Sequence, residues 1–440
     1  MRGSNSGYLH QRAETGAPIR IGLIGVGQMG AGIVSQCSHL PGIEIVALAD
    51  VDVARTTRAL ARTGVSNPLL ADDADAGSAG VSEGRTVITS DSELIPNLPV
   101  DVVIEATGVP EVGIRVGLAA AFAKKHLVSM NVEADVTVGR LLRRMFALAG
   151  KVYTIGAGDE PAVAWGLVDL CRTIGLEVVA AGKGKNNPLD FTATPSSVRA
   201  EALSKGMNPR MLAAFVDGTK TMCEMTALAN ATGLSLDVPG MHGPMIDTAD
   251  LAGTFCPSED GGILSQRGVV DYVTGDVAPG VFVVITTDDA DVSSDLRYLS
   301  VGTGPYWTLT RPFHLANLEL PVSIVEAVRG NRATLVPEHH MAELGATAKR
   351  DLAPGDLISG IGGEEVFGFA WPADQARERN LVPMGLAEGA TVIKQVAQGS
   401  ALTFDDVEIQ ETSVLARAWH MQEHLDSFGL EEVPWATLAS

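Results

Sequence analysis

Two lysines separated by one glycine are the side chains of this chain best suited to act on a carbonyl group. Lys183 and Lys185 lie in residues 182–188, directly after a predicted strand. An ammonium group in a partly dry site can polarise a carbonyl, stabilise an alkoxide or bind a phosphate as a point charge. A pair of solvated lysines in a turn is the alternative. The polar tail that begins at Asn186 favours the functional interpretation, and we include Asn186 among the candidate catalytic residues.

Carboxylates and one histidine are the other candidates for chemistry. Glu133 and Glu160 follow predicted strands and could transfer a proton. Asp159 and Glu160 together offer the oxygen ligands that Mg²⁺ and Mn²⁺ prefer. Helix capping is the alternative for Asp159, because Asp-Glu-Pro suits the first turn of a helix. His242 lies in a glycine-rich loop, where a hydrogen bond to substrate and a packing role are equally open.

Three glycines form a phosphate-binding pattern near the start of the chain. The apolar, β-branched run 19–24 leads into Gly25-x-Gly27-x-x-Gly30, and a helical pattern follows over 30–40. Gly25 allows a tight turn, Gly27 lets the backbone approach a pyrophosphate, and Gly30 lets the helix pack closely on the strand. The N-terminus of that helix offers N–H groups and partial positive charge to the phosphates.

An acidic residue follows the second predicted strand at the spacing of a dinucleotide site. Asp50 ends the strand 44–49 and would accept hydrogen bonds from a ribose diol. Its carboxylate repels a 2′-phosphate, which favours NAD, although NADP is possible. Thr107, Gly108 and Asn131 follow later strands and would line the path to the nicotinamide. The predicted cofactor residues are therefore Gly25, Val26, Gly27, Gln28, Met29, Gly30, Asp50, Thr107, Gly108 and Asn131.

Alternating strand and helix patterns predict an α/β fold with a doubly wound parallel sheet of the Rossmann type over residues 1–155. Residues 63–85 are rich in Gly, Ser, Ala and Asp, which predicts a surface loop. The segment 131–135 is likewise predicted as a loop. The strand before Lys183 is expected to end at residue 181.

The rest of the chain changes character twice. Residues 156–340 have mixed α and β patterns, with helices expected over 196–205 and 209–231. Residues 341–440 contain a weak repeat of strand, glycine turn and short polar-apolar stretch, which predicts a small all-β module closed by a helix over 414–425. The predicted division is a nucleotide-binding domain, a catalytic domain and a C-terminal β domain.

Composition excludes several classes of protein. The net charge of −21 argues against a nucleic-acid partner, because phosphate binding needs clustered Lys and Arg. We found no apolar run long enough to span a membrane and no signal pattern at the N-terminus. The four cysteines have no metal-type spacing, and most are expected to be buried thiols in a reducing cytoplasm.

Five segments together resemble a known family. They are 22–25, 131–135, 156–161, 182–188 and 240–244. They resemble the homoserine-dehydrogenase-like oxidoreductases with a C-terminal SAF domain, and within them the second, non-classical group of 1-deoxy-D-xylulose 5-phosphate reductoisomerase-like proteins. The resemblance covers nearly the whole chain.

This resemblance implies a cytoplasmic NAD(P)-dependent oxidoreductase that acts on a small polyhydroxylated acid or ketose, with or without phosphate. It also implies a homo-oligomer that pairs through the middle domain. The family reaction would isomerise the substrate on a divalent metal before hydride transfer. Asp50 departs from the NADPH pattern expected of reductoisomerases, so an NAD-dependent dehydrogenase without isomerisation is an alternative. A non-catalytic NAD(H)-sensing or carbohydrate-binding protein is another.

Overall fold

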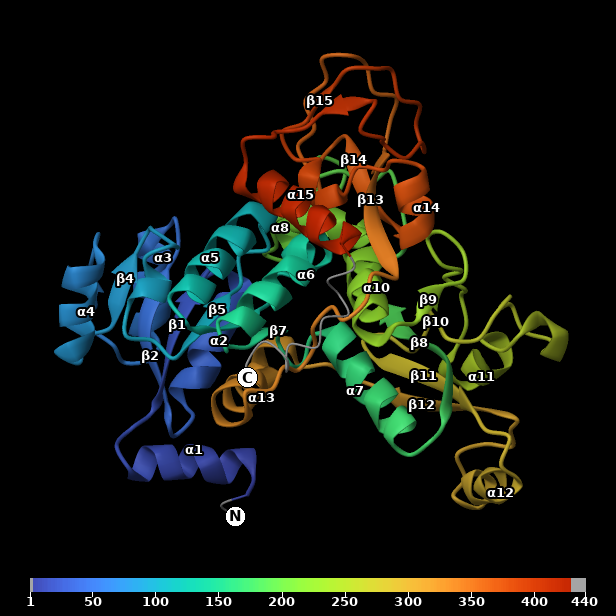
Figure 1. Cartoon of the computed structure of the whole chain (residues 1–440), viewed down its shortest axis with the longest axis horizontal. Coiled ribbons are helices and arrows are strands. Elements are labelled where there is room, and N and C mark those ends of the chain that lie inside the picture. The colour runs from blue at the N-terminus through green and yellow to red at the C-terminus, as the bar shows by residue number, and fades with distance from the viewer. Residues whose placement is uncertain (1–2, 429–440) are drawn as a thin grey trace. The chain divides into compact units, whose positions relative to one another are not determined.

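Residues 3–428 are described by the computed structural model and divide into two units. The first unit comprises residues 3–159, 315–336 and 413–428, and the second comprises 160–314 and 337–412. Figure 1 labels the elements of both units. The chain thus returns to the first unit twice after leaving it. The predicted three-domain division remains a prediction.

A seven-stranded parallel sheet organises the first unit and confirms the predicted Rossmann-type fold. Its strand order is β3-β4-β2-β1-β5-β6-β7, which reverses direction on either side of β1. The strands are β1 (Ile19–Ile24), β2 (Ile43–Ala49), β3 (Leu69–Leu70), β4 (Val87–Thr89), β5 (Val102–Glu105), β6 (His126–Ser129) and β7 (Tyr153–Ile155). All of them except β3 form from apolar runs anticipated from the sequence, whereas β3 lies in the segment predicted as a loop.

Helices of the first unit pack in two groups. Helix α13 (Ala316–Gly330) packs on α2 (Gln28–Ser38), and Leu320 and Ile324 of α13 join the core of the sheet. Helix α15 lies across α5 and α6, as Figure 1 shows. The other helices are α1 (Asn5–Glu14), α3 (Val53–Ala61), α4 (Ala74–Ser82), α5 (Pro110–Phe122), α6 (Val132–Leu148) and α15 (Val414–Ser427).

The prediction that residues 63–85 form a loop is wrong, because they contain α4 and β3. Asp73 caps α4 by accepting a hydrogen bond from the Ala76 amide at 2.8 Å. A Cβ atom on Gly77 would lie 2.6 Å from the Leu98 side chain, and one on Gly80 would lie 2.2 Å from Leu69. These glycines therefore allow α4 to pack closely against its neighbours, whereas a glycine-rich composition by itself predicts a loop.

Two further segments differ from the prediction. Residues 131–135 are not a loop, because Asn131 caps α6 through the Ala134 amide at 3.0 Å and the helix runs on to Leu148. Helix α13 was not predicted, since Pro321 stands inside it and proline removes a helical N–H donor.

A five-stranded mixed sheet forms the centre of the second unit. Its order is β12-β11-β8-β10-β9, with β8 parallel to β10 and antiparallel to β11. Helices α7 and α10 pack on this sheet, and α10 is buried along nearly its whole length. The elements are α7 (Glu160–Thr173), β8 (Glu177–Lys185), α8 (Arg199–Ser204), α9 (Pro209–Val216), α10 (Thr219–Thr232), β9 (Ser235–Leu236), α11 (Leu251–Thr254), β10 (Val269–Thr274), β11 (Val281–Thr286), α12 (Ala290–Tyr298) and β12 (Tyr306–Arg311).

The prediction of a loop over residues 182–188 is also wrong for residues 182–185, which belong to β8. Strand β8 extends through Lys185, because Lys183 pairs with Tyr272 of β10 and Lys185 pairs with Thr274. Both lysines are thus fixed by a sheet rather than carried on a turn. The position of Asn186 is exposed and lies just beyond the strand.

Short antiparallel pairs follow in the second unit. They are β13 (Ala342–Ala348) with β14 (Val366–Pro372) and β15 (Thr391–Val392) with β16 (Val407–Glu408); helix α14 (Ala373–Glu378) follows β14. Cys37, Cys171, Cys223 and Cys256 are all buried and free, as expected. Within residues 3–428, none of the helices has the length and apolarity needed to cross a membrane.

Candidate functional site

The three strands at the centre of the first sheet end side by side. Ile24 of β1 pairs with Ala49 of β2 on one side and with Glu105 of β5 on the other. The turn that begins at Gly25, the residue Asp50 and the residues after Glu105 therefore start at one edge. This is the edge at which ligands bind in open parallel sheets.

The three glycines of the turn have the geometry that the sequence pattern requires. Gly25 has φ +88°, and a Cβ atom there would lie 2.8 Å from the backbone of Ala106. A Cβ on Gly30 would lie 1.9 Å from the carbonyl oxygen of Gly25. Gly27 differs, since no described heavy atom lies within 4 Å of a Cβ built there.

Gly27 is also the N-cap of α2, and it has no side chain with which to satisfy the first N–H groups of the helix. A helix N-terminus with open space beside its cap is suited to a phosphate. Gln28 and Met29 are exposed in the first turn, whereas Val26 is buried. The residues present thus fit the pyrophosphate of a dinucleotide.

Asp50 is held firmly at the end of β2. Its Oδ2 atom accepts a hydrogen bond from the Val26 amide at 2.7 Å, and its Oδ1 atom accepts one from the Asp52 amide at 2.8 Å. The guanidinium of Arg55 lies 3.5 Å from Oδ2. This fixed carboxylate can accept hydrogen bonds from a ribose diol, with a half-exposed cation beside it.

Thr107 and Gly108 lie where the sequence places them, directly after β5. The amide of Thr107 donates to the buried Glu105 carboxylate at 2.8 Å, and its hydroxyl donates to the same oxygen. Burial raises the pKa of Glu105 to about 6, against the hydrogen bonds from Thr107. Asn131 is fully buried, caps α6 and donates to the Val109 carbonyl at 3.0 Å.

Acidic groups in the first turn of α6 are buried. Glu133 is 8% exposed and Asp135 is 3% exposed. The Tyr153 hydroxyl donates to Asp135 Oδ1 at 2.7 Å, and burial raises the pKa of Asp135 to about 7. Asp135 was not among the predicted catalytic residues, whereas Glu133, two positions earlier, was. Asp159 is buried at the end of the first unit.

The raised pKa of Asp135 predicts a pH-dependent gain on substitution. The unfolded chain ionises this group near its ordinary value of 3.8, so the stability that the protonated carboxyl contributes is lost as pH rises toward 7. We expect Asp135→Asn to raise the free energy of unfolding by about 2 kcal/mol more at about pH 8 than at about pH 5. Urea unfolding at both pH values measures this. Asp75→Asn, an exposed acidic residue of α4, is the control, and an effect of Asp135→Asn that does not change with pH would contradict the prediction.

Lys183 is the centre of a charged cluster in the second unit. Its Nζ atom donates to Glu160 Oε1 of α7 at 2.8 Å and to Glu224 Oε2 of α10. His314 Nε2 lies 3.3 Å from the same oxygen of Glu160. Lys183 and Glu224 are buried, and Glu160 is more accessible. We call Lys183, Glu160, Glu224 and His314 the lysine–carboxylate cluster.

The charges of this cluster fix the protonation of Lys183. Burial alone would lower the pKa of Lys183, but the carboxylates of Glu224 and Glu160 outweigh burial and hold it above its ordinary value. Burial raises the pKa of Glu224, and the neighbouring charge of Glu160 adds to this. Lys183 is therefore a permanent cation, and the two carboxylates account for two of its three N–H donors.

Lys185 has a different environment on the same strand. Its Nζ atom donates to the carbonyls of Asn187 at 2.7 Å and Phe215 at 3.0 Å. Burial, and then the charge of Lys183, lower the pKa of Lys185 to about 8. Lys183 therefore provides a fixed positive charge, whereas Lys185 titrates close to neutral pH.

His242 belongs to a hydrogen-bonded loop in the second unit. Its Nε2 atom lies 2.8 Å from Asp237 Oδ2, and its amide donates to Asp271 at 3.0 Å. Although burial would raise the pKa of Asp237, hydrogen bonds from Ser265 and His242 lower it. The ring of His242 is therefore oriented by a carboxylate, and its predicted catalytic role remains a prediction.

Glu224 and His314 are the members of the cluster that sequence reasoning did not select. Glu224 is the one carboxylate of α10, a helix otherwise rich in Met, Ala and Thr, and a carboxylate in such a setting is a signal that could have identified it. Glu160 accepts a hydrogen bond from the Lys183 ammonium at 2.8 Å, and its predicted role as a metal ligand remains a prediction.

Comparison with known proteins identifies a related catalytic domain. Residues 158–320 match the family model described as oxidoreductase DRL, catalytic domain, and all four residues of the lysine–carboxylate cluster lie in that range. No match was found among curated proteins. The resemblance to an oxidoreductase family is confirmed at this level. The finer grouping with homoserine-dehydrogenase-like proteins and the SAF domain remains a prediction.

Several solved structures are similar in fold. A probable dehydrogenase from Thermotoga maritima is 16% identical, with 60% of this chain and 72% of that chain covered and a TM-score of 0.35. A DOX-P reductoisomerase solved with fosmidomycin and magnesium is 17% identical, with 49% and 58% covered and a TM-score of 0.37. A myo-inositol dehydrogenase from Corynebacterium glutamicum is 10% identical, with 71% and 89% covered and a TM-score of 0.41. At such TM-scores these likenesses decide nothing about the chemistry of the site.

Proposed function

We propose that this chain is an NAD(P)-dependent oxidoreductase that acts on a small polyhydroxylated substrate, with or without a phosphate group. The observation that carries the proposal is the turn from Gly25 to Gly30, in which Gly27 leaves open space at the N-terminus of α2 while Asp50 ends the neighbouring strand. The match of residues 158–320 to an oxidoreductase catalytic domain supports it.

In this proposal the nicotinamide nucleotide, when bound, accepts or delivers the hydride. The backbone at Gly25, Gly27 and Gly30 holds the pyrophosphate, and Asp50 holds the adenosine ribose. Lys183 stabilises negative charge on the reacting oxygen, because its ammonium group stays protonated. Lys185 transfers the proton, since its pKa of about 8 lies closer to the working pH than that of Lys183.

The preference for NAD is proposed from Asp50, whose carboxylate would repel a 2′-phosphate. Asp50→Ser keeps a small polar group and removes one of the two carboxylates beside Arg55, at 3.5 Å, while Asp52 stays at 3.6 Å, so that Arg55 is better able to attract that phosphate. We expect the ratio of NADPH to NADH affinity to rise by about tenfold or more. Fluorescence titration with both nucleotides measures the ratio, with Asp52→Ser as the matched control. An unchanged ratio in Asp50→Ser would argue against the proposed position of the ribose.

The role of Lys185 predicts a pH profile. A base must be neutral to accept a proton, so kcat/KM for substrate oxidation should rise as pH approaches about 8 and then level off. In Lys185→Arg, whose guanidinium does not lose its proton in this range, that rise should disappear. Rates from about pH 6 to pH 10 test this. A wild-type inflection that persists in the variant would assign the titration to another group.

A screen of sugar acids and sugar phosphates tests the proposed function itself. Turnover of NAD⁺ or NADP⁺ by one of these compounds supports it, and analysis of the product separates simple dehydrogenation from isomerisation coupled to hydride transfer. Asp50 favours the NAD-dependent dehydrogenase as the second candidate. Nucleotide binding without turnover of any substrate would leave the sensing protein as the better description.

The predicted metal requirement and oligomeric state can be measured in the same preparation. The carboxylates of Glu160 and Glu224 both bind the Lys183 ammonium. The metal site at Asp159 and Glu160 remains a proposal that rests on their carboxylate oxygens, and the homo-oligomer remains a proposal that rests on the resemblance. Activity after treatment with a chelator addresses the first of these, and light scattering addresses the second.

A further inference from the structure

A fully buried carboxylate lies directly behind the turn that follows β5. Glu105 is the last residue of that strand and is 0% exposed, whereas Thr107 is partly exposed and Gly108 is exposed. Burying a charged group costs free energy unless hydrogen bonds or a partner charge compensate for it. Glu105 was not among the candidate residues predicted from the sequence, and the hydrogen bonds that it accepts indicate what it does.

One oxygen of Glu105 fixes the conformation of this turn. Its Oε1 atom accepts a hydrogen bond from the Thr107 amide at 2.8 Å and a second one from the Thr107 hydroxyl. The same hydroxyl accepts a hydrogen bond from the Val109 amide at 3.2 Å. The Val109 carbonyl accepts one from Asn131 Nδ2 at 3.0 Å. The turn is therefore held both by the strand before it and by the residue that caps α6.

Within residues 3–428, these hydrogen bonds leave the Thr107 hydroxyl with one lone pair. A hydroxyl has one proton to donate and two lone pairs that accept. Glu105 takes the proton, and the Val109 amide uses one lone pair. Burial raises the pKa of Glu105 to about 6, so its carboxyl group is ionised at about pH 8 and keeps that proton directed toward itself. The hydroxyl can therefore accept a hydrogen bond from a bound molecule, but it has no proton left to donate.

Thr107 and Asp50 lie on opposite sides of the glycine turn. Strand β1 has β2 on one side and β5 on the other, and the three strands end together. A Cβ atom on Gly25 would lie 2.9 Å from the Thr107 amide nitrogen, so the two turns are in direct contact. A dinucleotide crosses such an edge with one half on either side of its pyrophosphate. With the adenosine ribose at Asp50, as proposed above, the nicotinamide half lies over Thr107.

From these contacts we propose that Glu105 is a positioning residue for the nicotinamide half of the bound nucleotide. It orients the Thr107 hydroxyl so that this hydroxyl accepts one hydrogen bond from that half. Glu105 acts only through Thr107, because none of its own surface is exposed to a ligand. This inference rests on the proposed function, since it takes the pyrophosphate to bind at the glycine turn.

NADH and ADP form the pair of probes, because both carry adenosine and a pyrophosphate and only NADH has the nicotinamide half. Glu105→Gln keeps the shape of the side chain but removes the charge that orients the hydroxyl. At about pH 8 it should weaken NADH binding by about fivefold or more and ADP binding by less than about twofold. Isothermal titration calorimetry on the full chain measures both affinities. An equal loss of affinity for the two nucleotides, or no loss for NADH, would overturn the proposal.

Variants of Thr107 show whether Glu105 acts through this side chain. Thr107→Val removes the hydroxyl and should weaken NADH binding by about fivefold or more, whereas Thr107→Ser keeps the hydroxyl and should stay within about twofold of wild type. Adding Glu105→Gln to Thr107→Val should cause no further loss, because the group that Glu105 orients is already absent. Losses that multiply in the double variant would overturn the proposal. If Glu105→Gln does not fold, Glu105→Asp replaces it, since the shorter side chain draws the carboxylate away from Thr107.

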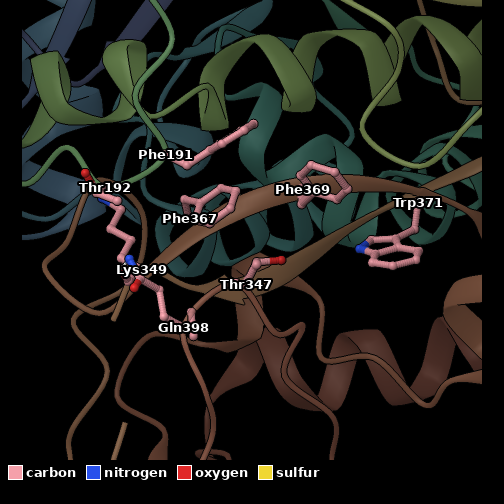
Figure 2. Close-up of a pocket in the computed structure, with 10 residues that line it drawn as sticks. Phe191, Thr192, Thr347, Lys349, Phe367, Phe369, Trp371 and Gln398 are labelled. Atoms are coloured by element: carbon pink, nitrogen blue, oxygen red, sulfur yellow. Dashed lines mark hydrogen bonds between the residues drawn. The ribbon is translucent and has the colours of Figure 1, made fainter. Parts of the chain in front are cut away.

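The second unit contains a matched control for these variants. Thr192 donates its amide at 2.9 Å and its hydroxyl at 2.6 Å to Asp190 Oδ1, which is the same arrangement two residues apart. Both residues are exposed, and Figure 2 shows Thr192 beside a cavity that is lined by aromatic side chains. Thr192→Val and Asp190→Asn should leave the affinities for NADH and ADP unchanged. A loss of NADH affinity as large as in Thr107→Val would overturn the proposal.

The wild-type protein separates failure of this inference from failure of the proposed function. If it binds neither NADH nor ADP, the proposed function is overturned and this inference with it. If it binds both and the ratio of the two affinities does not change in Glu105→Gln, only the role of Glu105 is overturned. ADP-ribose, which has the second ribose but no nicotinamide ring, identifies the donor. A loss shared by ADP-ribose supports a ribose hydroxyl as the donor, and a loss confined to NADH supports the amide of the ring.

Discussion

Lys183→Met should lower kcat by about 100-fold or more while leaving nucleotide affinity unchanged. The ammonium group is fixed by Glu160 and Glu224 and stays protonated, so it can stabilise a developing alkoxide without reorganising. Removing one such preorganised donor typically costs about 100- to 1,000-fold in rate. Steady-state kinetics with the substrate from the screen, together with NADH titration, measures both quantities.

Lys183→Met will also destabilise the protein, because it leaves two carboxylates near each other without their cation. Breaking a buried ion pair in this way costs about 3–5 kcal/mol. The double variant Lys183→Met with Glu224→Gln removes the more deeply buried charge and should recover much of that stability, yet it should remain inactive. Recovery of activity together with stability would show that Lys183 is a structural residue.

Lys205→Met is the matched control for these variants. Lys205 also pairs with a glutamate, Glu201, at 2.6 Å, but both side chains are half exposed. Exposed pairs of this kind contribute little to stability. This control should therefore keep wild-type activity and wild-type stability, which separates loss of a buried catalytic charge from loss of any lysine.

The strands of the first unit were predictable from sequence because their signal is local. Runs of buried β-branched residues such as 19–24 mark strands by themselves, and the glycine pattern after them marks the turn. Helix α4 was missed because Gly77 and Gly80 by themselves indicate a loop. In the structure these glycines make room for the side chains of Leu98 and Leu69. That information lies in tertiary packing and not in the local sequence.

The same distinction explains what could be predicted of the candidate site. Lys183 and Lys185 could be selected from the sequence as candidates, but their placement on a loop was wrong, since only pairing with β10 reveals that β8 continues through them. Glu224 reaches Lys183 from a helix 41 residues later, and no spacing rule connects the two. Sequence reasoning therefore identifies the charged residue more readily than the partners that set its pKa.

Gly27→Ala should abolish most nucleotide binding without disturbing the fold. The φ angle of Gly27 is −69°, which alanine adopts readily, and no described heavy atom lies within 4 Å of the added Cβ. The methyl group therefore meets no atom of the protein and can only obstruct a ligand that approaches the start of α2. We expect NADH affinity to fall by about tenfold or more, because the pyrophosphate needs close contact with this backbone.

A thermal unfolding midpoint within a few degrees of wild type would confirm that Gly27→Ala folds normally. Gly166→Ala, an exposed glycine of α7 with similar free space around its Cβ, is the control and should bind NADH as the wild type does. Gly30→Ala cannot serve in this experiment, since its Cβ would lie 1.9 Å from the Gly25 carbonyl and disturb the fold itself. Wild-type NADH affinity in Gly27→Ala would show that the pyrophosphate does not bind at this turn, and the proposed oxidoreductase activity would lose its main support.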